Sequence, residues 1–400
     1  MNMPCRIGII GGGQLGRMLA MAAKQMGHHV TVLDPVPHSP AGQVADRQIV
    51  AGFAHAPSLR ELVENSDVVT YEFEHVDAGA LHALEAEGHV IRPSAATLLW
   101  IQDKLVQKTR LRNHGVDVPD FMEVLGKRDL EEGARRFGYP FVLKRRHGGY
   151  DGKGFWVIRH EEELEALGAL ADGTSMLAER YVDYACELSV MVACSSEGDA
   201  VMYPVSQNVH EEGILRLSIV PANVGADVEA RVRSLCRRVI GTLSDVGVFC
   251  VELFLTTDGQ VLVNEIAPRP HNSGHYTIEA CATSQYEQLV RVMTGCAPGS
   301  ATLRSACAMS NLLGPADVAG PYRVEGLQTL LCEADVHVHL YGKAFAAHRK
   351  KLGHVTVLDA NAERAAVRCM AAARDIRFVP DAHAPAHESA GPIHRKETGR

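Results

Sequence analysis

The sequence predicts an α/β and α+β protein of two or three domains, and three observations lead to this prediction. The chain has 400 residues, more than one hydrophobic core usually organises. Residues 6–34 follow a strand–helix–strand pattern, which is typical of a parallel sheet. Later segments alternate as antiparallel strands do and include a strong hairpin signal.

Composition excludes several functional classes. With 46% hydrophobic and 22% charged residues the chain is an ordinary globular protein, and no apolar run approaches the roughly 18–20 residues of a membrane span. A net charge of −8 gives no general attraction to nucleic acid or to anionic membranes. The ten cysteines form no CxxC pair, and no cleavable leader precedes the first apolar run, so we expect a cytoplasmic protein.

The N-terminal unit carries a glycine turn. Arg6–Ile10 is expected to be a strand, Arg17–Met26 a helix and Val30–Leu33 the next strand. The turn GGGQLG, from Gly11 to Gly16, fits the dinucleotide pattern GxGxxG, and Asp34 supplies an acid after the second strand. The same turn can be purely structural or can serve another ligand at the carboxyl edge of a parallel sheet.

Two acids follow a further strand. Val68–Glu74 reads as a strand, and Glu72 and Glu74 would share one of its faces if the strand persists. They could bind an amine or sugar hydroxyl groups, or they could lie solvated at the end of the strand.

A second glycine-rich loop joins two predicted strands, Phe141–Arg145 and Phe155–Ile158. A Walker loop opens a helix and carries GK[ST], so the loop RHGGYDGKG is of another kind. Its glycines let the backbone approach phosphate oxygens, whose charge Lys144 and Lys153 could balance. The alternative is a hairpin tip that binds nothing.

The most informative stretch is the hairpin predicted between Val248 and Val263. An Asp-Gly pair, Asp258-Gly259, separates two apolar runs and predicts a two-residue turn. That turn pairs Leu255 with Leu262, and it places Glu252 opposite Glu265.

Opposed carboxylates repel each other, so we expect a compensating feature at Glu252 and Glu265. A shared proton would raise one pKa, whereas Mg²⁺ would bind both carboxylates together with substrate phosphates. Two solvated glutamates are the alternative. The continuation Arg269-Pro270-His271-Asn272 favours the cation site, because it sets hydrogen-bond donors beside it.

The last part of the chain reads as a smaller β-rich domain. Lys343 and Arg349 lie near the base of a predicted hairpin and could cradle a phosphate monoester, or they could form an ordinary solvated cluster. From Asp381 onward the composition is typical of a disordered tail.

Taken in order, these features resemble the ATP-grasp superfamily of carboxylate–amine ligases, with a Rossmann-like pre-ATP-grasp domain and a small β-rich C-terminal domain. Within it, the segments similar to the 5-(carboxyamino)imidazole ribonucleotide synthetases of purine biosynthesis are GGGQLGRM (Gly11–Met18), TYEFEHV (Thr70–Val76), KRRHGGYDGKG (Lys144–Gly154), NVHEEGILR (Asn208–Arg216), NEIAPRPHNSGH (Asn264–His275), YGK (Tyr341–Lys343) and RKKLGH (Arg349–His354). The resemblance implies domains at 1–104, 105–304 with a lid at about 120–190, and 305–380, before a tail at 381–400.

The resemblance also implies an activity. ATP would phosphorylate bicarbonate to carboxyphosphate, and the exocyclic amine of 5-aminoimidazole ribonucleotide would then be carboxylated, with release of ADP and phosphate. The implied cofactors are ATP and Mg²⁺, for which Mn²⁺ could substitute. The implied assembly is a homodimer with small-molecule substrates and no nucleic-acid or membrane partner.

Site residues are implied position by position. The ATP site would comprise Lys104, Lys144, Gly149, Tyr150, Asp151, Gly152, Lys153, Gly154, Phe155, Glu179, Arg180, Tyr181, Val182, Glu187, His210, Asn264 and Glu265. Glu252 and Glu265 would hold the metal, and Arg269, His271 and Asn272 would hold bicarbonate or carboxyphosphate. The ribonucleotide would contact Gln14, Glu72, Asp151, Lys343 and Arg349, the last two through its phosphate.

Three other functions compete with this interpretation. A formate-dependent glycinamide ribonucleotide transformylase shares the carboxylate hairpin and a PRPH segment, but YEFEHV and the continuation Asn272–His275 count against it. A nicotinamide-dependent dehydrogenase would rest on Gly11–Gly16 and Asp34 alone. A non-catalytic nucleotide-binding module would lack the metal carboxylates, which are present.

Overall fold

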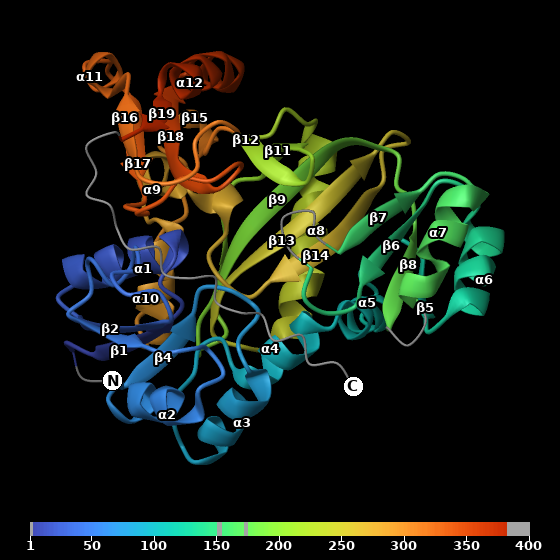
Figure 1. The fold of residues 1–400 in the computed structure, drawn as a ribbon, viewed down its shortest axis with the longest axis horizontal. Helices are drawn as coiled ribbons and strands as arrows, with labels where there is room; N and C mark the ends of the chain where they lie inside the picture. The colour runs from blue at the N-terminus through green and yellow to red at the C-terminus, as the bar shows by residue number, and fades with distance from the viewer. Residues whose placement is uncertain (1–2, 150–153, 172–174, 382–400) are drawn as a thin grey trace.

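The computed structural model describes residues 3–149, 154–171 and 175–381. Figure 1 shows an N-terminal α/β layer, a large central sheet, a separate sheet-and-helix lid and a C-terminal group of strands above the N-terminal layer. The mixed α/β and α+β fold class predicted from the sequence is confirmed. The predicted tail falls outside the described residues, apart from Asp381 itself.

The N-terminal domain is a four-stranded parallel sheet in the order β3-β2-β1-β4. Its elements are β1 (Arg6–Ile10), α1 (Gln14–Gln25), β2 (His29–Asp34), β3 (Arg47–Val50), α2 (Ala56–Glu64), β4 (Val68–Tyr71), α3 (Ala78–Ala86) and α4 (Ala95–Gln102). The predicted strand–helix–strand unit is confirmed. Because β4 ends at Tyr71, the expectation that Glu72 and Glu74 share a strand face is wrong.

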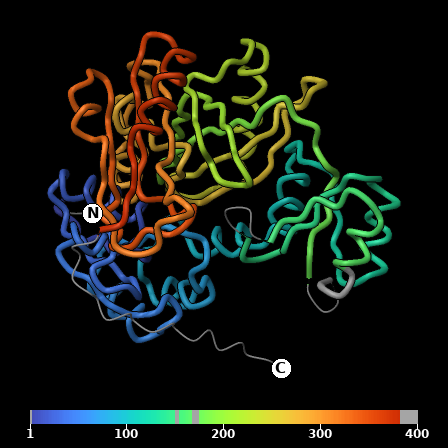
Figure 2. Tube along the Cα trace, turned by 45° about the horizontal axis from the view of Figure 1, so that its top comes forward, coloured from blue at the N-terminus to red at the C-terminus, as the bar shows by residue number. Residues whose placement is uncertain are grey.

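The lid is an antiparallel sheet in the order β5-β8-β6-β7 with two helices on one face. Its elements are β5 (Phe121–Val124), α6 (Lys127–Phe137), β6 (Phe141–Arg145), β7 (Phe155–Ile158), α7 (Glu161–Ala171) and β8 (Met176–Arg180), and α5 (Lys104–Asn113) leads into them. Leu130, Phe141 and Ile158 belong to a hydrophobic core that the lid does not share with the other parts. Figure 2 shows this unit set to one side of the body.

The central sheet runs in the order β14-β13-β9-β11-β12-β15-β18-β17, with β10 paired to β9. Its strands are β9 (Tyr184–Cys194), β10 (Ala200–Met202), β11 (Ser206–Glu211), β12 (Ile214–Val220), β13 (Gly247–Thr256), β14 (Val261–Ala267), β15 (Ala306–Leu313), β17 (Val336–Leu340) and β18 (Lys351–Asp359). The associated helices are α8 (Ala226–Leu243), the 3₁₀ turn η1 (Asn272–Gly274), α9 (Thr277–Ala280) and α10 (Gln285–Met293).

Alternation along β13 decides which of its residues face the site. Phe249, Val251 and Leu253 pack in one core with residues of α8. Side chains of a strand point to opposite faces in turn, so Cys250 and Glu252 lie on the other face. The burial of the odd-numbered residues beneath α8 therefore fixes the direction of the carboxylate.

The loop of the carboxylate hairpin is one residue longer than predicted. The backbone N–H of Thr256 donates to the carbonyl of Gln260, so residues 257–259 form a three-residue loop. Gly259, with a φ of 85°, takes the left-handed position that such loops require. As a result Leu255 pairs with Val261, and both the two-residue turn and the Leu255–Leu262 pair are wrong.

A β-bulge further along the same hairpin shifts the pairing of the two strands by one residue. Leu253 pairs with Val263 and Glu252 pairs with Glu265, so Asn264 is an extra residue in β14. The predicted pairing of the two glutamates is therefore confirmed, although two local features combine to produce it.

The C-terminal strands continue the central sheet. β15 pairs antiparallel with β12, and β18 and β17 follow it. The remaining elements are β16 (Tyr322–Glu325), α11 (Leu327–Leu330), α12 (Ala362–Asp375) and β19 (Arg377–Pro380), with β16 paired to β19. Within the described residues, no helix has the length and apolar character needed to cross a bilayer.

Candidate active site

The two opposed glutamates have different electrostatic environments. The Glu265 Oε2 atom lies 2.7 Å from Lys104 Nζ, and this charge lowers the pKa of Glu265. Burial, followed by the charge of Glu265, raises the pKa of Glu252, whose Oε1 atom lies 3.1 Å from His271 Nε2. The positive charge of Lys104 therefore offsets part of the repulsion between the two carboxylates. The pKa of Glu252 is instead raised, so a bound cation would stabilise its charged form more than that of Glu265.

The bulge residue Asn264 connects the central sheet to the lid. Its Oδ1 atom accepts a hydrogen bond of 3.1 Å from Lys144 Nζ, on β6. Lys144 Nζ also lies 2.9 Å from Glu179 Oε2, on β8. Residues of the predicted ATP site from two sheets thus meet in one network.

Lys108 belongs to the same network and was not predicted. Its Nζ atom lies 3.1 Å from Glu179 Oε1, and both side chains are almost fully buried. Burial lowers the pKa of Lys108 to about 8, while Lys108 and Lys144 outweigh burial and lower the pKa of Glu179. Lys104 and Lys108 are four residues apart on α5, and this helical spacing is the signal that could have revealed Lys108.

A second predicted pair meets on the central sheet. The Glu187 carboxylate, on β9, forms a hydrogen bond with His210 Nδ1, on β11. Burial opposes the charged imidazole, but the Glu187 carboxylate outweighs it and raises the pKa of His210.

The remaining predicted ATP contacts lie at the edge of the lid. Arg180 is exposed at the end of β8, and Tyr181 and Val182 follow on the connection to β9. Lys144 Nζ lies 5.9 Å from the ring centroid of the exposed Phe155. Gly149 and Gly154 flank Tyr150, Asp151, Gly152 and Lys153, which fall outside the described residues.

Arg269, His271 and Asn272 lie directly after β14, between the carboxylate hairpin and the N-terminal domain. Arg269 Nη2 lies 2.7 Å from Glu74 Oε1, which follows β4. Burial, together with the nearby Arg269 charge, holds the pKa of His271 well below its usual value, so its imidazole is neutral. The backbone of His271 is fixed by Gln285, which accepts from its N–H at 2.9 Å and donates to its carbonyl at 2.8 Å.

The orientation of the Asn272 amide is set by two residues that sequence reasoning missed. Asn272 Oδ1 lies 3.1 Å from His275 Nε2, and Tyr286 Oη lies 2.8 Å from His275 Nδ1. Burial keeps His275 neutral by lowering its pKa, so Nε2–H donates to Asn272 and Nδ1 accepts from Tyr286. The Asn272 side chain is thereby fixed with its Oδ1 atom toward His275.

His275 is also part of a stack of imidazoles. Its ring centroid lies 4.5 Å from that of His354, which lies 4.4 Å from that of His339. Tyr341 Oη lies 2.9 Å from His354 Nδ1. The stack connects β17 and β18 to the Asn272 segment, and no local sequence pattern indicates it.

We expect Tyr286→Phe to weaken use of the anionic substrate, because it removes the hydroxyl that fixes the His275 tautomer. For bicarbonate, the substrate that the resemblance implies, the catalytic efficiency should fall about tenfold, the effect of one lost hydrogen bond. Steady-state kinetics at varied bicarbonate measures this value. In ¹⁵N-labelled protein, the Nε2-protonated tautomer of His275 should lose its dominance.

The matched control is Tyr203→Phe. Tyr203 is equally buried, and its hydroxyl donates to the carbonyl of Thr283 at 3.0 Å and not to His275. If both variants changed bicarbonate kinetics equally, the Tyr286 effect would reflect packing and not the tautomer.

The N-terminal glycine turn holds a side chain of the same protein. The Glu72 carboxylate accepts hydrogen bonds from the backbone N–H groups of Gly13 and Gly16, the second at 2.5 Å. A Cβ atom at Gly11 would lie 2.4 Å from Glu72 Cγ, so glycine is required there. Asp34 accepts from the N–H of Gly12 at 2.7 Å. The features that suggested a dinucleotide site therefore serve internal contacts.

Of the predicted ribonucleotide residues, Gln14, Glu72 and Lys343 lie around this turn and Arg349 does not, while Asp151 falls outside the described residues. Gln14 begins α1, and the carbonyl of Gly342, next to Lys343, accepts from Gln43 of the N-terminal domain at 2.8 Å. The Arg349 guanidinium instead contacts the Glu212 carboxylate in the turn between β11 and β12. Its role at the phosphate stays a prediction.

Three family models match the chain. A ribonucleotide synthetase preATP-grasp domain matches residues 4–102, an ATP-grasp domain matches 109–286, and a phosphoribosylaminoimidazole carboxylase C-terminal domain matches 307–368. The boundaries predicted at residues 104 and 304 stay predictions.

Curated relatives and solved structures agree with these models. The chain is 42% identical over 353 residues to the N5-carboxyaminoimidazole ribonucleotide synthase of Bacillus subtilis, with 88% of this chain and 91% of the relative covered. The Thermotoga maritima synthetase structure superposes with a TM-score of 0.86 and 43% identity, covering 94% and 100% of the two chains. The Aspergillus clavatus enzyme, solved with ADP and 5-aminoimidazole ribonucleotide, has a TM-score of 0.84 and 30% identity, covering 92% and 98%. The chain belongs to the N5-carboxyaminoimidazole ribonucleotide synthases, ligases of the ATP-grasp superfamily.

Proposed function

We propose that this protein uses ATP to carboxylate the exocyclic amine of 5-aminoimidazole ribonucleotide with bicarbonate, in purine biosynthesis. One observation carries the proposal. Arg269 and His271 bridge the two halves of the site, since Arg269 pairs with Glu74 of the N-terminal domain and His271 contacts Glu252 of the hairpin. An anion held between them would lie between the proposed ATP and ribonucleotide sites.

The first step transfers the γ-phosphoryl group of ATP to a bicarbonate oxygen. Phosphoryl transfer needs positioning and charge neutralisation more than covalent help. Lys104 and Lys144 supply positive charge beside Glu265 and Asn264. Arg269 presents a rigid planar donor group to bicarbonate, and Asn272 adds its NH₂ group.

In the second step the ribonucleotide amine attacks the carbon of carboxyphosphate, and phosphate leaves. Carboxyphosphate is labile in water, so the site must exclude solvent while it exists. The glycine loop joins β6 to β7 of the lid, which has its own core and can move as a unit. Closure of the lid would protect the intermediate.

Glu252, Glu265 and Asn264 fit Mg²⁺. They offer carboxylate and amide oxygens, the hard ligands that Mg²⁺ prefers, next to the lysines assigned to the phosphates. When bound, the cation would neutralise charge on the transferred phosphoryl group. Mn²⁺ takes the same ligand types and would substitute for it.

Product formation tests the proposed activity. With ATP and Mg²⁺, ADP release should require both bicarbonate and 5-aminoimidazole ribonucleotide, and it should not respond to formate plus glycinamide ribonucleotide. A coupled assay for ADP measures the rate, and omission of each substrate in turn is the control. Stimulation by the formate pair alone would reject the proposal in favour of a transformylase.

Two further properties belong to the proposal. A cytoplasmic location is supported by ten cysteines that are all free thiols. A homodimer is supported by the family resemblance, and light scattering on the purified chain measures it directly.

A further inference from the structure

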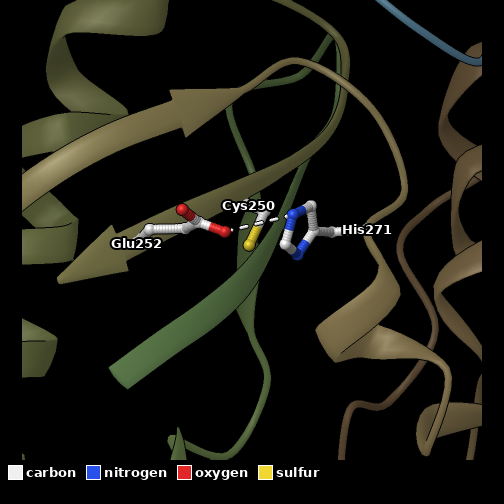
Figure 3. Close-up of side chains that lie close together, drawn as sticks. All are labelled: Cys250, Glu252 and His271. Atoms are coloured by element: carbon white, nitrogen blue, oxygen red, sulfur yellow. Dashed lines mark ion pairs between the residues drawn. The ribbon is translucent and has the colours of Figure 1, made fainter. Parts of the chain in front are cut away.

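Three potential metal ligands of different chemical type converge on the site face of β13. Cys250 Sγ, a Glu252 carboxylate oxygen and a His271 ring nitrogen all lie within 4.8 Å of one another (Figure 3). Within this group Glu252 Oε1 lies 3.1 Å from His271 Nε2. The proposed reaction uses Glu252 and His271, but it assigns no role to Cys250.

The backbone and a neighbouring serine hold this arrangement. Cys250 and Glu252 are two residues apart on β13 and share one face. His271 Nδ1 lies 2.8 Å from Ser273 Oγ, so its Nε2 atom is turned toward Glu252. Cys250 Sγ lies 3.8 Å from the same Ser273 Oγ. The Ser273 backbone N–H also donates to His271 Nδ1 at 3.3 Å, so Ser273 fixes the orientation of the imidazole ring.

We propose that Cys250, Glu252 and His271 form a binding site for a thiophilic divalent cation, with Zn²⁺ as the best fit. One sulfur, one nitrogen and one oxygen ligand with a fourth position left open is a ligand set that Zn²⁺ accepts. Mg²⁺ prefers oxygen ligands alone, so the sulfur selects against it.

Binding exchanges the thiol proton for the metal. The S–H bond of Cys250 breaks, the S–Zn bond forms, and one proton is released to solvent without any change of oxidation state. In the unloaded site His271 Nδ1 accepts from the Ser273 N–H, and Nε2–H donates to Glu252. On binding, the imidazole proton moves to Nδ1, where the Ser273 hydroxyl oxygen accepts it, so His271 ligates through the Nε2 lone pair and Glu252 ligates as a carboxylate.

Occupation of this site would inhibit the enzyme. Glu252 can then no longer serve as a ligand in the proposed Mg²⁺ site, and His271 can no longer contact bicarbonate. This inhibitory consequence rests on the proposed function, whereas binding of the cation does not. A direct measurement of metal binding therefore distinguishes failure of this inference from failure of the proposed activity.

Cobalt(II) is the probe for the binding test, used on the full chain with a reductant that contains no thiol. One equivalent of Co²⁺ should produce a thiolate-to-cobalt charge-transfer absorption, and Zn²⁺ should abolish it by displacement. Cys250→Ser should lose the absorption. Cys236→Ser is the matched control, because Cys236 is equally buried on α8, and it should keep the absorption.

Persistence of the absorption in Cys250→Ser would show binding at other thiols, such as the exposed Cys332, and would overturn the inference. X-ray absorption of the zinc-loaded wild-type protein covers the case in which the variant does not fold. It should show one sulfur among nitrogen and oxygen ligands, and a shell without sulfur would overturn the inference equally.

Inhibition is measured as ADP release over a range of Zn²⁺ concentrations, normalised to each variant without zinc. Loss of a direct ligand should lower the affinity for the metal at least as much as loss of a residue that hydrogen-bonds to a ligand. Half-inhibition of Cys250→Ser should therefore require at least about tenfold more Zn²⁺. Suppose that Cys250→Ser loses the cobalt absorption but is half-inhibited at the same Zn²⁺ concentration as the wild type. The proposed inhibition would then be wrong, although the metal site itself would stand.

Discussion

Glu265→Gln should abolish turnover and leave the fold intact. Glu265 is the carboxylate whose pKa is lowered by Lys104, so it is charged throughout the neutral range and can hold a cation together with Glu252. Gln keeps the shape but removes the charge. Removal of one electrostatic group that stabilises a transition state lowers kcat about 100- to 1,000-fold, and we expect a loss in this range or larger.

The measurements are ADP release at saturating substrates and the unfolding temperature. The Lys104–Glu265 pair is partly exposed, so its loss should shift the unfolding temperature by only about 2–4 °C. Glu229→Gln on α8 is the control. It also removes a carboxylate from an ion pair, because Glu229 Oε1 lies 2.9 Å from Arg233 Nη2. Near-normal activity of Glu265→Gln would refute the metal role.

Lys343→Ala should raise the KM for the ribonucleotide about 10- to 100-fold with a much smaller effect on the KM for ATP. The estimate corresponds to the loss of one charge-assisted hydrogen bond to the phosphate. Lys343 lies next to Gly342, whose carbonyl is held by Gln43 of the N-terminal domain, and its charge acts on Glu72. Steady-state kinetics with each substrate varied separately gives the two KM values.

Lys350→Ala is the matched control for Lys343. Lys350 belongs to the same segment, but its Nζ atom donates to the carbonyl of Phe345 at 2.8 Å. It should leave the ribonucleotide KM unchanged. If Lys343→Ala left this KM unchanged as well, Lys343 would have no place at the phosphate.

Local patterns predicted the parts of this structure that depend on local chemistry. The strands Arg6–Ile10, Phe141–Arg145 and Phe155–Ile158 have the predicted bounds because each is a short apolar run between clear turn signals. The Glu252–Glu265 pairing followed from the hairpin signal. Its details did not, since an Asp-Gly pair suits two- and three-residue loops and a bulge has no reliable local pattern.

Tertiary contacts decided the rest. β4 stops at Tyr71 because Glu72 turns to the amides of the glycine loop, some 60 residues earlier in the chain. Lys108 and Tyr286 gain their roles only from partners on other elements. The convergence of Cys250 with His271 likewise depends on how the chain returns after β14.

The pairing of β12 with β15 has a mechanical consequence. Val220 and Cys307 are neighbours across this seam, so the strands of the C-terminal segment are hydrogen-bonded to the catalytic sheet and not merely packed on it. Removal of that segment would leave the backbone groups of β12 as an open sheet edge, which invites pairing with other chains. The lid has no such shared strand, because its sheet is separate. Hydrogen-bonded strands therefore form one continuous frame from the carboxylate hairpin to β17, and the lid, like the N-terminal sheet, is joined to this frame without a shared strand.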